Sequence, residues 1–195
     1  MRHPQGAIRM AHILLFHSIL GLRPIERDLA REWEAAGHTV TLADLYDGRT
    51  AQDYDAGFAI HGEIGPARVR ARGEALAASA PEDSVLAGVS MGGDLVGHLW
   101  GQRPRCPGAL LISGPAPWSP DLRPGFPVQS HIAHPDPFDG EEFFADWVAR
   151  NPGAALDLRR YDGVGHYFLD PTLPDHGEQA ARDCRAAMLE FLAKL

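Results

Sequence analysis

The sequence predicts an α/β fold in which a mostly parallel, open sheet is covered by helices on both faces. Short, nearly continuous apolar runs, typical of strands buried on both sides, alternate along the chain with segments of helical periodicity. No repeat, low-complexity tract or long linker divides the 195 residues, so we expect one domain over residues 1–195. Hydrophobic residues make up 45% and charged residues 23%, as in ordinary globular proteins.

The first unit of the fold is predicted to be a strand, a helix and a second strand. Residues 12–17 form the first apolar run. A helix that Pro24 opens and Gly37 closes leads from this run to a strand over residues 38–45. Such a unit has a right-handed crossover, which starts a parallel sheet.

The rest of the chain continues the alternation. Residues 46–65 contain several glycines and polar residues and predict a loop with a short helix. Two late helices are predicted from their apolar positions, which are Phe143, Phe144, Trp147 and Val148 in one and Ala181, Cys184, Met188, Phe191 and Leu192 in the other. The other predicted elements are helices over residues 66–79 and 91–102 and strands over 84–89, 109–113, 128–133 and 156–161.

The charge and the cysteine content disfavour several classes of function. Lys and Arg total 18 against 26 Asp and Glu, and the net charge of -8 disfavours binding to nucleic acid. The two cysteines, Cys106 and Cys184, are too few for a disulfide framework and lack metal-ligand spacing; Cys184 is predicted to be buried in the last helix. We therefore expect neither a metal nor another cofactor, and a reducing, cytoplasmic location.

The sequence contains no recognisable membrane or export signal. No apolar run reaches the roughly 20 residues of a membrane helix, so we expect no membrane association. Residues 1–11 are polar and lack the apolar core of a signal peptide. We expect them to be a flexible extension ahead of the first strand, with translation starting at Met1 or at Met10.

Residues 88–92, Gly-Val-Ser-Met-Gly, form a turn between a predicted strand and a predicted helix. A nucleophilic serine needs such a turn, because its hydroxyl must project above the edge of the sheet. The strand and the helix then approach so closely that glycine is required two residues before and after the serine. The alternatives are a helix-capping serine and a phosphate-binding turn, although the Walker and dinucleotide patterns are missing from this stretch. We interpret Ser90 as a nucleophile.

A serine nucleophile needs a histidine base and a carboxylate that orients it, and the chain order for this kind of turn is serine, acid, histidine. His166 follows a predicted strand within the turn formed by residues 163–168. The alternative, His176, lies between Asp175 and Glu178, which predict the capping box of the last helix and hence an exposed histidine. We therefore predict His166 as the base.

Two aspartates follow the strand that precedes this region. Asp136 lies between Pro135 and Pro137, which keep the backbone extended and suit a carboxylate of fixed position. Asp139 has another explanation, because with Glu142 it predicts the N-terminal cap of the following helix. We favour Asp136 as the acid and keep Asp139 as the alternative.

An oxyanion hole needs backbone N–H groups that converge on one oxygen. The amide of Met91, at the start of the helix after the nucleophile, is predicted to supply one, and the amide of Ile19, in the loop after the first strand, the other. Substrate contacts are expected from Ser18, Trp118 and Tyr167. For Trp118 and Tyr167, packing in the core or in a loop is the alternative.

With these residues placed, the chain resembles the dienelactone hydrolase family over most of its length. The segments that carry the resemblance are residues 14–24, 43–49, 88–93, 131–138 and 161–168. The resemblance implies an α/β-hydrolase fold, a nucleophile, acid and base at Ser90, Asp136 and His166, and an oxyanion hole from the Ile19 and Met91 amides.

The chain departs from the family pattern at three points. The name-giving enzymes of the family have cysteine where this chain has Ser90, and a glutamate that regulates the thiol where this chain has Ser18. The family's arginine for a substrate carboxylate, just after the catalytic histidine, is replaced here, with Asp170 nearby. We therefore do not expect hydrolysis of dienelactone itself.

These observations together predict a serine hydrolase that cleaves a small carboxylic ester, lactone or thioester through an acyl-enzyme. The alternative is a non-catalytic or regulatory ligand-binding protein on a hydrolase scaffold, which Ser18 in place of the family glutamate would favour. Transfer of the acyl group to an acceptor other than water is a third hypothesis. The expected partner is a small-molecule ester, and the sequence does not predict the oligomeric state.

Overall fold

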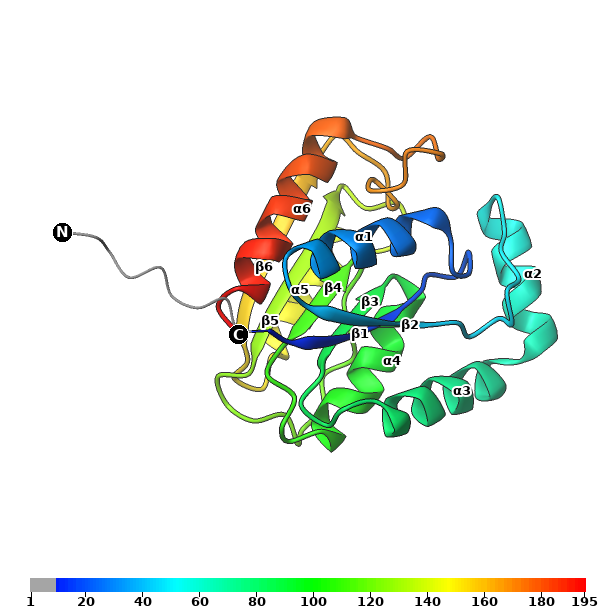
Figure 1. The fold of residues 1–195 in the computed structure, drawn as a ribbon. Helices are drawn as coiled ribbons and strands as arrows, with labels where there is room; N and C mark the ends of the chain where they lie inside the picture. Colours follow the sequence, from blue (N-terminus) through cyan, green and yellow to red (C-terminus); the bar gives the residue numbers. More distant parts are fainter. Residues whose placement is uncertain (1–9) are drawn as a thin grey trace.

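Six parallel strands form one sheet in the order β2-β1-β3-β4-β5-β6 (Figure 1). The computed structural model describes residues 10–195, so most of the predicted extension over residues 1–11 lies outside the described residues. The strands are β1 (His12–Phe16), β2 (Thr39–Ala43), β3 (Val85–Val89), β4 (Ala109–Ile112), β5 (Pro127–His134) and β6 (Ala155–Asp162). The helices are α1 (Pro24–Ala35), α2 (Tyr54–Ile64), α3 (Pro66–Ser79), α4 (Met91–Leu99), the 3₁₀ turn η1 (Trp100–Gln102), α5 (Glu141–Ala149) and α6 (Glu178–Leu192).

The central strands are buried on both faces, which explains their continuous apolar sequences. Every residue of β3 and β4 is buried, and so are four of the five residues of β1. The edge strands β2 and β6 consist mostly of exposed and half-buried residues. Apolar side chains are needed on both faces of a strand only where helices cover both faces of the sheet.

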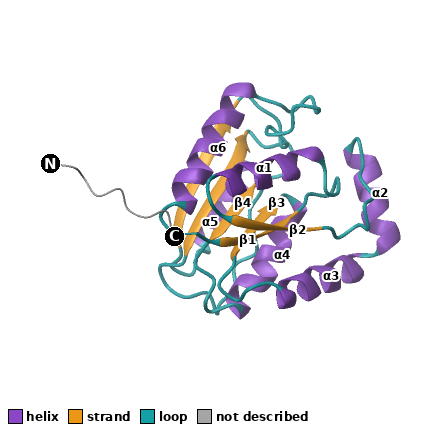
Figure 2. Cartoon of the chain, viewed as in Figure 1, coloured by secondary structure: helices purple, strands orange, loops and turns teal. Residues whose placement is uncertain are grey.

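The helices form two layers, one on each face of the sheet. Helices α1 and α6 cover one face, whereas α3, α4 and α5 cover the other (Figures 1 and 2). The chain leaves β1 towards one edge of the sheet, forms β2, and returns past β1 to form β3. The strand order thus reverses between β1 and β3, and in open α/β sheets the ligand site lies at the carboxyl ends of such strands.

The predicted elements agree closely with the structure. The predicted helix over residues 66–79 is α3, and the predicted strands differ from the observed ones by at most two residues at either end. The predicted helix over residues 91–102 is α4 followed by η1. Residues 46–65, predicted as a loop with a short helix, contain α2, a regular helix of 11 residues.

The predicted apolar face of α5 is only partly correct. Phe144 and Trp147 are buried, but the side chains of Phe143 and Val148 are 48% and 41% exposed. The reason is that only a narrow stripe of this helix, which has nine residues, packs onto the protein. In α6 the predicted stripe is buried apart from Phe191, which is half-buried, and Cys184 is fully buried. No helix in the described part of the chain is long and apolar enough to cross a bilayer.

Candidate active site

Ser90 lies at the sharp turn between β3 and α4, at the carboxyl edge of the sheet. Its backbone has a φ of 49° and a ψ of -112°, a conformation that costs a non-glycine residue of order 1–3 kcal/mol. The neighbouring glycines are required: a Cβ on Gly88 would lie 2.4 Å from the Gly92 backbone, and one on Gly92 would lie 2.4 Å from the carbonyl oxygen of Phe16. The strand, the strained turn and the helix therefore have the arrangement that projects a serine hydroxyl above a sheet edge.

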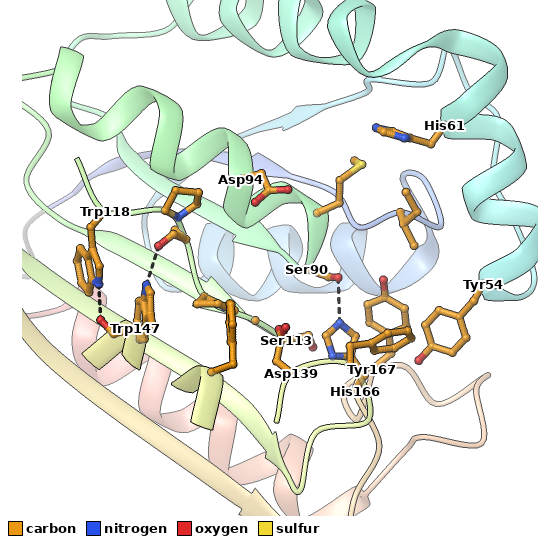
Figure 3. Close-up of a pocket in the computed structure, with 18 of the residues that line it drawn as sticks. Tyr54, His61, Ser90, Asp94, Ser113, Trp118, Asp139, Trp147, His166 and Tyr167 are labelled. Atoms are coloured by element: carbon orange, nitrogen blue, oxygen red, sulfur yellow. Dashed lines mark hydrogen bonds between the residues drawn. The ribbon is translucent and has the colours of Figure 1, made fainter. Parts of the chain in front are cut away.

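The imidazole of His166 lies between the Ser90 hydroxyl and the Asp136 carboxylate. His166 is positioned by the loop after β6, and its Nε2 is 2.9 Å from Ser90 Oγ (Figure 3). Its Nδ1 is 2.7 Å from Asp136 Oδ2. Because a carboxylate only accepts hydrogen bonds, Nδ1 carries the proton, and Nε2 is free to accept the serine proton. The structure thus brings together the three side chains that the sequence predicted as nucleophile, base and acid.

Asp136 is held in its position by its own loop. Only 7% of the residue is exposed, and its Oδ1 accepts the backbone N–H groups of Phe138 (2.9 Å) and Asp139 (3.2 Å). Burial alone would raise the pKa of the Asp136 carboxyl, but the hydrogen bonds from His166 and from these amides outweigh it and hold the pKa below its usual value. Asp136 is therefore an ionised group that fixes the orientation of the imidazole.

Two predicted helix caps are wrong. The residue that caps α5 is Gly140 and not Asp139, and α6 is capped by Gly177, with no side-chain hydrogen bond from Asp175. Asp139 instead lines the cavity in front of Ser90, where burial, followed by the charge of Asp136, raises the pKa of its carboxyl. Asp175 binds the hydroxyl of Tyr54 and the backbone N–H of Tyr167. The Asp175 carboxylate thus has partners in the tertiary structure in place of a helix end, whereas Asp139 faces the cavity.

His176 is therefore not an exposed residue in the first turn of α6. It is half-buried ahead of the helix, and its Nδ1 lies 3.0 Å from the carbonyl oxygen of Phe168. His98, on α4, contacts Glu74 of α3. In the described part of the chain, His166 is the histidine that is hydrogen-bonded to Ser90.

The loop after β1 is held so that Ile19 lines the cavity. Burial lowers the pKa of His17 to about 4, so the imidazole is neutral and has one N–H donor. Its Nε2 accepts the Leu45 N–H at 3.0 Å, and its Nδ1 therefore donates to the Ser18 carbonyl oxygen at 2.6 Å. The Leu20 N–H is bound by Ser18 Oγ at 3.2 Å. Ile19 and Met91 both line the cavity together with Ser90, as expected for donors to an oxyanion.

A cavity of about 720 Å³ opens in front of Ser90. Of the residues predicted to contact substrate, Trp118 and Tyr167 line this cavity, whereas Ser18 does not. Ser18 is 2% exposed and lies in a small space behind the loop. Trp118 stacks on Trp147 with ring centroids 4.8 Å apart, and its Nε1 donates to the Trp147 carbonyl oxygen (Figure 3).

The sequence analysis missed most of the cavity wall. The missed residues come mainly from α2 and from the segment around α5, and they are Tyr54, Phe58, His61, Phe138, Asp139, Phe143 and Trp147. One signal could have indicated them, because the fold leaves large aromatic side chains uncovered on α2, on α5 and in the loop ahead of α5. Phe58 is 56% exposed, Phe138 50% and Phe143 48%.

The sheet, its two helical layers and the serine turn define a member of the α/β-hydrolase superfamily. Similar solved structures include a dienelactone hydrolase-like promiscuous phosphotriesterase from metagenomic libraries, with a TM-score of 0.74 and 15% identity over 98% of this chain and 89% of that one. Another is a protein from Klebsiella pneumoniae subsp. pneumoniae MGH 78578 assigned to the dienelactone hydrolases, with a TM-score of 0.77 and 18% identity over 100% and 91% of the two chains. A third is a cold-adapted esterase from an Arctic intertidal metagenomic library, with a TM-score of 0.68 and 17% identity over 98% and 85%.

The model of the dienelactone hydrolase family matches residues 1–195, and the chain belongs to this family. A comparison with curated proteins found no match. The family identifies the chain as a hydrolase, and the structural neighbours, at these identities, show the fold.

Proposed function

We propose that this protein is a cofactor-free serine hydrolase that cleaves a small carboxylic ester, lactone or thioester. One observation carries the proposal: hydrogen bonds run without a break from Ser90 Oγ through the His166 imidazole to the Asp136 carboxylate. A serine hydroxyl is a weak nucleophile unless a correctly oriented base removes its proton. This chain of contacts meets that requirement.

In the proposed mechanism, Ser90 Oγ attacks the acyl carbon as its proton passes to His166 Nε2. The carbonyl oxygen becomes an oxyanion, which the amides of Ile19 and Met91 stabilise. The bond to the leaving alcohol or thiol then breaks, and His166 gives that group its proton, which leaves an acyl-enzyme on Ser90. Water adds to the acyl carbon with His166 again as the base, and the carboxylic acid is released. Asp136 stabilises the imidazolium in both halves of the reaction.

The cysteines do not compete for this role. Burial raises the pKa of Cys106 to about 11 and that of Cys184 to about 12. A thiol must ionise to attack, and both residues are buried away from the cavity. A small-molecule ester fits the cavity of about 720 Å³, which lies within the usual range for small ligands.

A fluorophosphonate probe, followed by peptide mapping, tests the proposal. The probe is expected to label Ser90, and the Ser90→Ala variant is expected to lose both the labelling and the hydrolysis of p-nitrophenyl acetate. Ser113 is the matched control, because it lines the same cavity but, among the described residues, no histidine side chain is hydrogen-bonded to its hydroxyl; its backbone N–H donates to the His131 carbonyl oxygen. Ser113→Ala should be labelled like the parent. Folded parent protein that neither reacts with the probe nor cleaves esters of graded length would contradict the proposal.

A further inference from the structure

We propose that the phenol of Tyr167 donates a third hydrogen bond to the oxyanion, beside the amides of Ile19 and Met91. This inference rests on the proposed serine hydrolase function and adds to it a side chain that touches the reacting atoms. The sequence predicted Tyr167 only as part of the substrate-binding wall.

The ring of Tyr167 is fixed in the wall of the cavity. Tyr167 is 5% exposed, and its ring packs edge-on against the His166 imidazole at a centroid distance of 4.8 Å. On its other side it stacks with Tyr54 at 5.3 Å. Asp175 Oδ2 accepts both the Tyr167 backbone N–H (2.9 Å) and the Tyr54 hydroxyl (2.7 Å). A donor on such a ring is pre-positioned and needs little reorganisation during the reaction.

The hydroxyl of Tyr167 points to the reacting centre. Tyr167 lines the cavity together with Ser90 and Ile19 and lines a small space beside Ser18. Figure 3 shows the side chain beside Ser90 and His166, and the proximity of Ser90, Ser18 and the Ile19 backbone acts to lower the pKa of the phenol. Ser90 is the attacking group, and Ile19 is a proposed oxyanion donor. The oxygen of a carbonyl that Ser90 attacks must come close to both residues, and it therefore comes within reach of the phenol.

The protonation of the phenol suits a donor. Burial raises the pKa of Tyr167 to about 12, although its contacts with Ser90, Ser18 and Ile19 oppose this rise and the charge of Glu26 adds to it. The phenol is thus neutral at neutral pH and keeps its proton through the reaction. It donates a hydrogen bond to the oxyanion, and its own O–H bond stays intact.

The test compares Tyr167→Phe with Tyr161→Phe, because each variant keeps its ring and loses one hydroxyl. Tyr161 lies on β6 and outside the cavity, and its hydroxyl is 2.8 Å from His131 Nδ1. We expect Tyr167→Phe to lower kcat for p-nitrophenyl acetate by on the order of 10²-fold, the loss typical of one oxyanion donor, with little change in KM. Tyr161→Phe should keep kcat within about threefold of the parent, because it loses a hydrogen bond outside the cavity. A trifluoromethyl ketone, which forms an oxyanion when Ser90 adds to it, should bind Tyr167→Phe more weakly by a similar factor, whereas the corresponding methyl ketone should not.

Three results would overturn the inference. One is an unchanged or raised kcat in Tyr167→Phe, the latter meaning that the phenol blocks the site. Another is an equal fall in kcat in both variants, which indicates a general effect of losing a buried hydroxyl. The third is weaker binding of both ketones. If Tyr167→Phe does not fold, 3,5-difluorotyrosine at position 167 replaces it, because this residue keeps the ring and lowers the phenol pKa. The kcat of that protein should fall at a lower pH than the kcat of the parent. An unchanged dependence of kcat on pH would count against the inference. Esterase activity that survives Ser90→Ala would instead refute the proposed function itself.

Discussion

The buried carboxyl of Glu26 gives a prediction about stability that can be worked out from the structure. Glu26 lies in the first turn of α1 and is fully buried; it accepts the backbone N–H groups of Arg23 (2.9 Å) and Ser18 (3.4 Å). Burial, with a smaller contribution from the charge of Asp170, raises its pKa from 4.5 to about 7, although the backbone hydrogen bonds act against this rise. The folded protein therefore binds this proton more tightly than the unfolded chain does.

The sign of the effect follows from proton linkage. Between pH 4.5 and about 7 the unfolded chain loses this proton while the folded protein keeps it, so the free energy of unfolding falls as the pH rises. The full effect is about 3 kcal/mol at about 1.4 kcal/mol for each pKa unit, of which about 2.5 kcal/mol develops between pH 5 and pH 8. Glu26→Gln cannot ionise, so its free energy of unfolding should gain about 2.5 kcal/mol relative to the parent over this range.

Urea denaturation at pH 5 and pH 8, followed by far-UV circular dichroism, measures this difference. The comparison between the two pH values cancels any constant effect of the substitution on packing. Glu34→Gln, which removes an exposed carboxylate from the same helix, should follow the parent at both pH values. A Glu26→Gln protein whose stability relative to the parent is the same at pH 5 and pH 8 would refute the assignment of a raised pKa to Glu26.

Three further predictions concern the site and the turn that carries it. Asp136→Asn should lower kcat by on the order of 10⁴-fold, because the imidazole loses the tautomer it needs. The kcat of Asp139→Asn should stay within about tenfold of the parent. Steady-state kinetics with p-nitrophenyl acetate measure both values, and a larger loss in Asp139→Asn than in Asp136→Asn would make Asp139 the acid. Gly92→Ala should destabilise the protein by about 1–3 kcal/mol or more, because the added Cβ would contact the Phe16 backbone. Gly62→Ala, whose Cβ meets nothing within 4 Å, should be neutral or stabilising by up to about 1 kcal/mol. Thermal unfolding measures both effects. An ester with a carboxylate on its acyl chain should have a kcat/KM on the order of tenfold below that of its uncharged isostere, because Asp94 and Asp139 both line the cavity, and equal rates would contradict this.

The parts of the site that the sequence predicted are those in which local geometry and chain order fix the chemistry. The glycines at 88 and 92 are needed wherever a serine turns from a strand into a helix, so the pattern and its setting together identified Ser90. The position of His166 after a strand, and of Asp136 between two prolines, placed both at the carboxyl edge of the sheet. Each of these three predictions uses one local segment of the sequence and does not depend on how distant segments pack.

The cavity wall and the helix caps could not be predicted in this way. Asp139 and Asp175 both stand where a capping residue would stand, but whether such a carboxylate binds a helix end depends on what else comes close in space. Asp175 meets Tyr54, which is 121 positions away along the chain. Likewise, α2 contributes Tyr54 and Phe58 to the cavity, and no pattern inside residues 46–65 shows that this helix lies across from α5.

One departure from the family pattern, Asp170 near the position of the family arginine, has a partner in the structure. Asp170 binds Arg23, whose Nε lies 2.9 Å from Asp170 Oδ2, and the remaining nitrogens of this guanidinium donate to the Ala51 carbonyl oxygen and to Thr172 Oγ1. Arg23 is 4% exposed, so it cannot turn towards a substrate. Among the described residues that line the cavity, Arg150 is the only arginine, and Asp146 pairs with it one helical turn away. A substrate carboxylate would therefore find its candidate partners already neutralised by aspartates and would also face Asp94 and Asp139. The loss of the family arginine thus goes together with a negative cavity, which favours an uncharged or cationic ester.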